Sequence, residues 1–179
     1  MLVERFAALC DRAARHGLLV AYEAIPGTLI ADLPAAVALV TAAGHPSGGL
    51  AVDAVHLFRG SHRGADEVLR AVPAALVTAV QIADGDASQL GVFAEAAPGV
   101  PGMPGGAPPL ARLLPGEGAF DLTMFLEVLD ASGADAPIGV ELINPDWRAK
   151  PVDEVARSSY DAAASVVRAA RERRGGVTS

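Results

Sequence analysis

Short apolar runs of β-strand character alternate along this chain with segments of helical periodicity, and this alternation constrains the fold more than any other feature. Four runs are predicted strands: LLVAYEA (18–24), LAVDAVHL (50–57), ALVTAVQIAD (75–84) and IGVELIN (138–144). Apolar residues at helical spacing predict helices over 2–16, 33–43, 64–72, 122–133 and 152–170. Asp32 and Asp121 precede two of these segments as predicted N-caps. Strands that alternate with helices of this length indicate βα units on a parallel sheet.

Each predicted strand carries a polar, oxygen-bearing side chain near its C-terminal end. Counted with a period of two, each of these side chains follows Ala or Gly on the same face of its strand; the four are Glu23, Asp53, Gln81 and Glu141. Four independent, solvated strand ends are the simpler interpretation, but four in phase favour a shared site. A small residue below a polar one suits the inner face of a β/α barrel, where inward side chains converge at the C-terminal mouth.

Convergence of these side chains predicts a metal site. Three carboxylates in close proximity repel one another unless a cation lies among them. Oxygen donors favour Mg²⁺ or Mn²⁺, with Co²⁺ as a further candidate, over metals that prefer thiolates. We therefore expect a divalent metal ion bound by Glu23, Asp53, Gln81 and Glu141.

His56 lies three residues after Asp53, so strict alternation would point it away from the site. It joins Asp53 only if the strand has ended or bulged by then, which makes HLFRG (56–60) the start of a loop. There it would bind a substrate oxygen or act as a general base, with a structural histidine as the alternative. Arg59 and Arg112 are candidates for binding a substrate carboxylate or phosphate.

Composition excludes several classes of partner. The 179 residues are 51% hydrophobic and carry a formal net charge of -7, with no basic cluster interleaved with aromatics, so nucleic acid is not expected as a partner. The longest apolar runs are shorter than the roughly 20 residues that span a bilayer, so no membrane association is expected either. A single cysteine, Cys10, and an N-terminus unlike a secretory signal fit a cytoplasmic location.

Residues 94–118 interrupt the alternation and are dense in Pro and Gly. They are predicted to form a long loop over an active site, in preference to a linker between domains.

In their order and spacing, several segments resemble the signature segments of the xylose isomerase-like TIM barrel family, the sugar phosphate isomerases and epimerases. The segments are EAIP, VDAVH, VQIAD, RLLPGEGAFDL and IGVELIN, and the resemblance covers nearly the whole chain. It implies a divalent metal held by the same four positions, with His56 close to the substrate. Many members have histidine where this chain has Gln81, and glutamine there resembles the branch that contains 3-dehydroshikimate and inosose dehydratases.

Family barrels have eight strands and about 250 residues, whereas only four strands are predicted here. The expected fold is therefore α/β, a partial (β/α)8 TIM barrel of about four βα units. Residues 1–179 would form one domain that lacks the N-terminal half of the barrel. A fragment, the product of a split gene, and a half-barrel that pairs with itself or with another chain are all consistent with this pattern.

The resemblance implies a metal-dependent isomerase or epimerase that removes a proton next to the carbonyl of a sugar, polyol or hydroxy-ketoacid. In that chemistry Glu23 and Glu141 are both ligands and the acid/base pair. The alternatives are a dehydratase of the same family, with His56 as the base, and a half-barrel remnant without catalysis.

Overall fold

The computed structural model describes residues 1–60, 64–93 and 111–176. Strands and helices alternate along the chain, as the sequence predicts. The strands are β1 (Val20–Glu23), β2 (Gly48–Asp53), β3 (Val77–Ile82) and β4 (Ile138–Val140). The α-helices are α1 (Leu2–Ala14), α2 (Leu33–Ala43), α3 (Ala54–Gly60), α4 (Ala65–Arg70), α5 (Leu122–Ser132), α6 (Pro145–Arg148) and α7 (Val152–Gly176), and the 3-10 helices are η1 (Ala74–Leu76) and η2 (Ala87–Gln89).

The four strands form one parallel sheet in the order β1-β2-β3-β4, so each strand pairs with its neighbour in the sequence. This confirms the predicted α/β class and the parallel βα units. The pairing register places Asp53 opposite Gln81, and Gln81 opposite Gly139. Two of the predicted site residues are therefore level with each other on adjacent strands.

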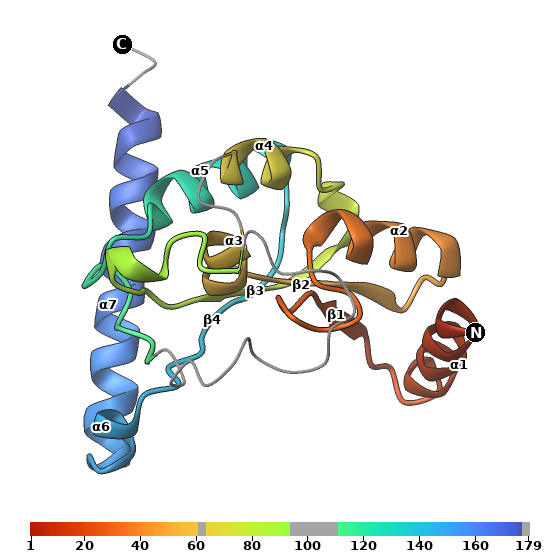
Figure 1. Ribbon diagram of the computed structural model, residues 1–179, viewed down its shortest axis with the longest axis horizontal. Coiled ribbons are helices and arrows are strands. Elements are labelled where there is room, and N and C mark those ends of the chain that lie inside the picture. Colours follow the sequence, from red (N-terminus) through yellow and green to blue (C-terminus); the bar gives the residue numbers. More distant parts are fainter. Residues whose placement is uncertain (61–63, 94–110, 177–179) are drawn as a thin grey trace.

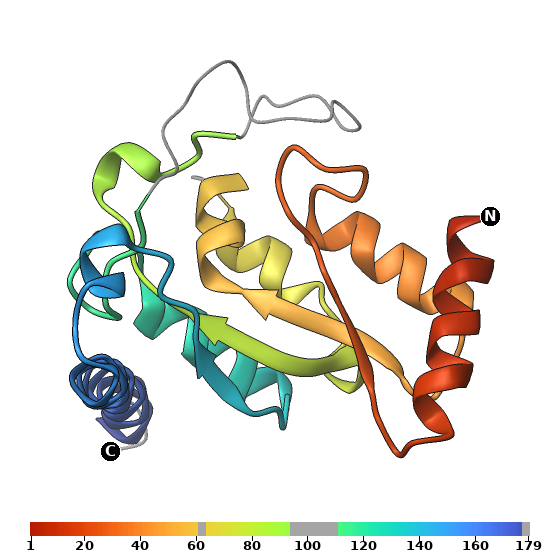
Figure 2. The same cartoon turned by 90° about the horizontal axis from the view of Figure 1, so that it is seen from below.

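Helices cover one face of the sheet and its two ends. In Figure 1, α2, α4 and α5 lie above the sheet, while α1 and α7 lie at opposite ends of the molecule, and Figure 2 shows the same arrangement from below. Both predicted caps are confirmed, because the Asp32 and Asp121 carboxylates accept hydrogen bonds from the backbone N–H groups of Ala35 and Met124. The core between sheet and helices is built around Leu50, Val52, Ile82, Phe125 and similar buried apolar side chains.

Counted with a period of two, Val77 is predicted to share the strand face of Ala79 and Gln81, opposite Val80 and Ile82, and this prediction is wrong. The pairing between β2 and β3 shifts register between Leu50 and Ala51, so Leu50 pairs with Val77 and Ala51 with Ala79. The shift leaves Thr78 as an extra residue on β3, and it turns Val77 into the helix-side core together with Val80.

Two strands end earlier than the apolar pattern predicts. β2 ends at Asp53, and the residues from Ala54 to Gly60 are helical, so HLFRG belongs to α3 and is not the start of a loop. β4 ends at Val140, which leaves Glu141 just beyond the last strand residue. Both carboxylates thus lie at the C-terminal edge of the sheet.

Residues 94–110 of the loop predicted over 94–118 lie outside the described part of the chain. The described part of this loop pairs with the end of β3 through an antiparallel bridge between Asp84 and Leu113. Within the described ranges, none of the helices combines the length and apolar character needed to cross a membrane.

The sheet is open at both ends, since β1 and β4 each pair on one side only within the described part of the chain. Leu19 beside β1 and Ile138 in β4 are exposed there, as is Tyr160 on α7. Unpaired strand edges promote association, and exposed apolar side chains beside them add to this tendency. We therefore expect the isolated 179-residue chain to self-associate or to be poorly soluble unless a complementary half-barrel covers these edges. Sedimentation velocity measures this, and a monodisperse, cooperatively folding monomer would contradict it.

Candidate active site and metal centre

Asp53 ends β2, and its carboxylate is fixed by partners on both oxygens. Oδ1 accepts hydrogen bonds from the backbone N–H groups of Val55 (2.6 Å) and His56 (3.3 Å), which caps the first turn of α3. Oδ2 accepts from Arg112 Nη1 at 2.7 Å. Because the side chain is buried, these contacts offset the cost of removing its charge from water.

His56 lies in the first turn of α3, and its ring turns toward the end of β1. Its Nε2 atom is 3.2 Å from Glu23 Oε1 and 3.4 Å from Arg112 Nη2. The expectation that His56 joins Asp53 once the strand has ended is confirmed by this geometry, although the segment that follows is a helix. The three residues Glu23, Asp53 and His56 offer ligand atoms that all lie within 4.8 Å of one another.

Two oxygen atoms in this region are buried without a hydrogen-bond partner in the described structure: Glu23 Oε1 and Gln81 Oε1. The contact of Glu23 Oε1 with His56 is close in distance but not aligned as a hydrogen bond. A buried, unpaired oxygen is costly unless a cation or donor reaches it. The donor set of carboxylate, amide and imidazole atoms therefore fits a divalent metal ion.

Arg112 lies at the centre of this cluster. Its side chain is only 3% exposed, and Nη1 contacts Asp53 Oδ2 and Glu141 Oε2 at 2.7 and 3.0 Å. The same nitrogen donates to the backbone carbonyl of Glu141 at 3.2 Å. One guanidinium thus bridges two of the carboxylates predicted as metal ligands, and it relieves the repulsion between them.

Glu141 differs from Asp53 in its exposure, since 38% of its side chain is accessible. Its pKa is raised above the ordinary glutamate value, first by burial; Arg112 opposes the shift, while Asp53 and Glu23 add to it. The raised pKa means that Glu141 holds a proton more readily than a free glutamate does.

Arg59 is buried and directed elsewhere. Its Nε and Nη2 atoms donate to Gln89 Oε1 at 3.1 and 2.6 Å, and Gln89 Nε2 in turn donates to the backbone carbonyl of Ala111. Burial, followed by repulsion from Arg112, lowers the pKa of Arg59 to about 10. These hydrogen bonds connect Arg59 to the segment that leads into Arg112, and its role in substrate binding stays a prediction.

Asp84 organises the segment that carries Arg112, and sequence reasoning missed this role. Its buried carboxylate accepts hydrogen bonds from the backbone N–H groups of Gly85, Gly116 and Phe120. A side chain at Gly118 would collide with the same carboxylate, which explains glycine there. Two signals were available in the sequence. An aspartate directly follows the apolar run VQIA (80–83), and glycines recur in PGEG (115–118), much further along the chain.

Asp84→Ala should lower the free energy of unfolding by about 3 kcal/mol, because two buried N–H groups and one partly buried N–H group lose their acceptor. Urea denaturation of the purified chain measures this. The matched control is Asp86→Ala, which removes an exposed carboxylate two residues away that caps η2. An equal loss in the two variants would mean that Asp84 does not hold the segment in place.

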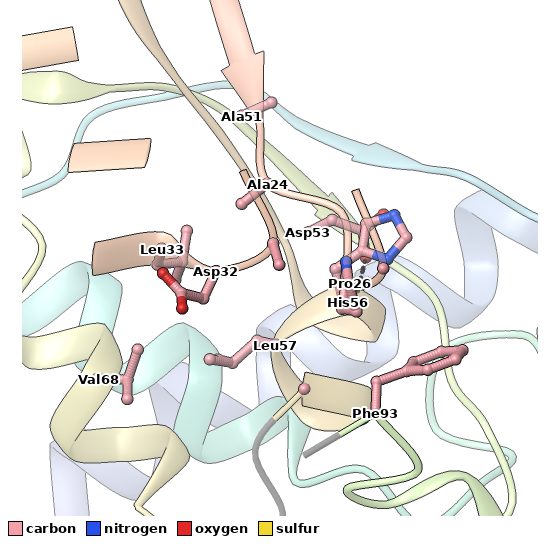
Figure 3. A pocket seen from close by; sticks show the side chains of 13 residues that line it. Ala24, Pro26, Asp32, Leu33, Ala51, Asp53, His56, Leu57, Val68 and Phe93 are labelled. Atoms are coloured by element: carbon pink, nitrogen blue, oxygen red, sulfur yellow. Dashed lines mark hydrogen bonds between the residues drawn. The ribbon is translucent and has the colours of Figure 1, made fainter. Parts of the chain in front are cut away.

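A cavity of about 100 Å³ opens beside Asp53 and His56. Figure 3 shows its walls, which combine the polar side chains of Asp53 and His56 with apolar ones such as Pro26, Leu57 and Phe93. This volume suits part of a small substrate. The polar cluster and the apolar walls together form a concave site at the C-terminal edge of the sheet.

Comparison with known proteins finds a matching family and several similar proteins. Residues 1–165 match the sequence model of the xylose isomerase-like TIM barrel. Two curated relatives are 3-dehydroshikimate dehydratases, one from Pseudomonas putida that is 28% identical over 152 residues and one from Pseudomonas aeruginosa that is 30% identical over 154 residues. Each alignment covers 84% of this chain but only 22% of the relative, so the chain spans about a fifth of their length.

Solved structures share the fold. The IolI protein with a bound zinc atom superposes with a TM-score of 0.71 at 21% identity, over 93% of this chain and 55% of that chain. An L-ribulose 3-epimerase superposes with a TM-score of 0.65 at 16% identity, over 99% of this chain and 58% of that chain. The four βα units therefore correspond to a little more than half of each of these proteins.

Proposed function

The chain belongs to the xylose isomerase-like TIM barrel family, and we propose that it supplies the metal-binding part of an enzyme that removes a proton next to the carbonyl of a polyol or hydroxy-ketoacid. The observation that carries the proposal is the cluster of Glu23, Asp53 and His56 beside a small cavity. The unpaired oxygen of Gln81, level with Asp53, supports it.

Glu23 and Asp53 would hold the ion, with Gln81 and Glu141 as the further candidates from the sequence, and His56 would lie beside it. A divalent ion bound there would supply a Lewis acid that polarises the substrate carbonyl. The zinc atom in the IolI structure supports a divalent metal in this fold. Mg²⁺, Mn²⁺ and Co²⁺ remain our candidates, because most of the donors are oxygens.

Dehydration is the reaction that we favour. His56 lines the cavity and would take the proton from the carbon next to the carbonyl. The β-hydroxyl would then leave as water on accepting a proton, and a carbon–carbon double bond would form. The two dehydratase relatives support this direction, and the Arg112 guanidinium, 3.4 Å from His56 Nε2, would bind a substrate carboxylate.

Isomerisation or epimerisation is the second candidate, and the raised pKa of Glu141 favours it. A glutamate that holds its proton more readily can serve as a general acid on one face of the substrate, with Glu23 as the base on the other. The structural likeness to an L-ribulose 3-epimerase is consistent with this reaction.

A substrate panel separates the two reactions. In a polypeptide or complex that contains the full barrel, we expect Mn²⁺-dependent dehydration of a cyclic hydroxy-ketoacid such as 3-dehydroshikimate to be faster than epimerisation of a free ketohexose. Absorbance of the conjugated product follows the first reaction, and chromatography of the sugars follows the second. Treatment with EDTA should abolish dehydration. Efficient epimerisation without dehydration would overturn the assignment.

A further inference from the structure

We propose that the guanidinium of Arg112 and the divalent metal ion compete for the same donor atoms, so that metal loading displaces Arg112 from the carboxylates and frees it for a substrate anion. This inference depends on the proposed function for the presence of a metal ion. The competition between Arg112 and the metal ion is a separate property, which a metal site alone does not imply. Arg112 would act as an internal cation that keeps the carboxylates together until the metal binds.

The contacts of Arg112 coincide with the atoms that a metal ion needs. Nη1 lies 2.7 Å from Asp53 Oδ2 and 3.0 Å from Glu141 Oε2, and Nη2 lies 3.4 Å from His56 Nε2. These atoms belong to three of the residues that the sequence or the structure offers as ligands. A metal ion accepts the same lone pairs that the guanidinium N–H groups now occupy.

Asp53 cannot serve both cations with different oxygens. Its Oδ1 atom is committed to the backbone N–H groups of Val55 and His56, and this bond pattern caps α3. Oδ2 is therefore the atom left for a metal, and it is the atom that Arg112 holds. Two positive charges that share one buried carboxylate oxygen repel each other strongly, because little water screens them.

Arg112 can release the carboxylates without unfolding its segment. Its backbone N–H donates to Ile143 O at 3.0 Å, and its backbone carbonyl accepts from Asn144 Nδ2 at 2.9 Å. Leu113 is joined to Asp84 by two backbone hydrogen bonds. Since the main chain is anchored on both sides by these bonds, the displacement requires only rotation of the long side chain.

Metal binding to a polypeptide or complex that contains the full barrel, with the wild-type chain or its variants, tests the competition. Titration calorimetry with MnCl₂ should give a dissociation constant that falls by about tenfold or more in Arg112→Gln, which removes the competing charge. Arg112→Lys keeps a positive charge but lacks the fork that reaches two carboxylates, so its dissociation constant should lie between those of the wild type and Arg112→Gln. Thermal denaturation without added metal should show the wild type as the most stable protein and Arg112→Gln as the least stable, so the variant that binds the metal most tightly is the least stable without it.

Arg148→Gln is the matched control, because it removes an exposed arginine of α6 and should leave the dissociation constant unchanged within about twofold. If Arg112→Gln does not fold, Arg112→Lys decides: tighter binding than wild type supports the competition. Binding that is unchanged or weaker in the variants, while the wild type binds Mn²⁺, would overturn the competition and leave the metal site standing. No binding in any protein would overturn both proposals.

Discussion

Asp53→Asn should weaken the binding of Mn²⁺ or Mg²⁺ by far more than tenfold, which corresponds to more than about 1.4 kcal/mol of binding free energy. The amide has nearly the same shape as the carboxylate, so the cap on α3 can persist while the negative charge at Oδ2 is lost. A neutral amide oxygen is a much weaker ligand for a hard divalent cation than a carboxylate is. Titration calorimetry on the wild type and the variant measures the difference.

Glu141→Gln, tested beside it, distinguishes the two candidate ligand sets. The sequence places Glu141 among the ligands, whereas the cluster that the structure brings within 4.8 Å contains Glu23, Asp53 and His56. A loss comparable to that of Asp53→Asn would place Glu141 in the coordination sphere. Asp121→Asn, at the cap of α5, is the control and should leave the affinity unchanged. Unchanged affinity in both site variants would refute a metal at this site.

The convergence of the strand ends could be predicted because it depends only on local patterns and on the parallel order of the strands. Alternation identifies which side chains share a face, and parallel pairing brings their C-terminal ends to one edge. Asp53 and Gln81, opposite each other in the register, follow directly from this reasoning. The early end of β2 was less predictable, because Ala54, Val55, Leu57 and Phe58 are apolar in a buried helix just as they would be in a strand.

The position of Arg112 could not be predicted, because it depends on contacts between segments far apart in the sequence. Arg112 is 59 residues from Asp53, and its approach requires the Asp84 carboxylate to hold the turn that follows it. The misassigned face of Val77 has a related cause. A register shift is a property of two paired strands, and the pattern of β3 alone contains no sign of it.

The burial of Arg59 also depends on tertiary contacts. Its partner Gln89 lies in η2, after the end of β3, in a region where the sequence offers only small and polar residues. An arginine after a predicted strand is equally typical of a substrate-binding residue and of a structural residue. The desolvation that lowers its pKa becomes visible only once both segments are packed together.

His56→Ala should abolish dehydration while the metal remains bound, with kcat reduced by a factor of about 10² to 10⁴, the usual contribution of a general base. The expected loss follows from the position of the ring beside the cavity and 3.2 Å from Glu23 Oε1, where an imidazole can accept a proton from a bound substrate. The assay uses a polypeptide or complex with the full barrel, and calorimetry with Mn²⁺ runs in parallel on the same variant. His45→Ala is the matched control, because His45 pairs with Asp11 of α1 and lies outside the cluster.

The two readouts together decide the role of His56. Lost turnover with retained metal identifies it as the base, since Asp53 and Glu23 then suffice to hold the ion together with the remaining donors. Lost turnover with lost metal would assign His56 to the coordination sphere, as its place within the 4.8 Å cluster also allows. Retained turnover would contradict the dehydratase mechanism and leave Glu23 and Glu141, on opposite edges of the sheet, as the acid/base pair of an epimerase.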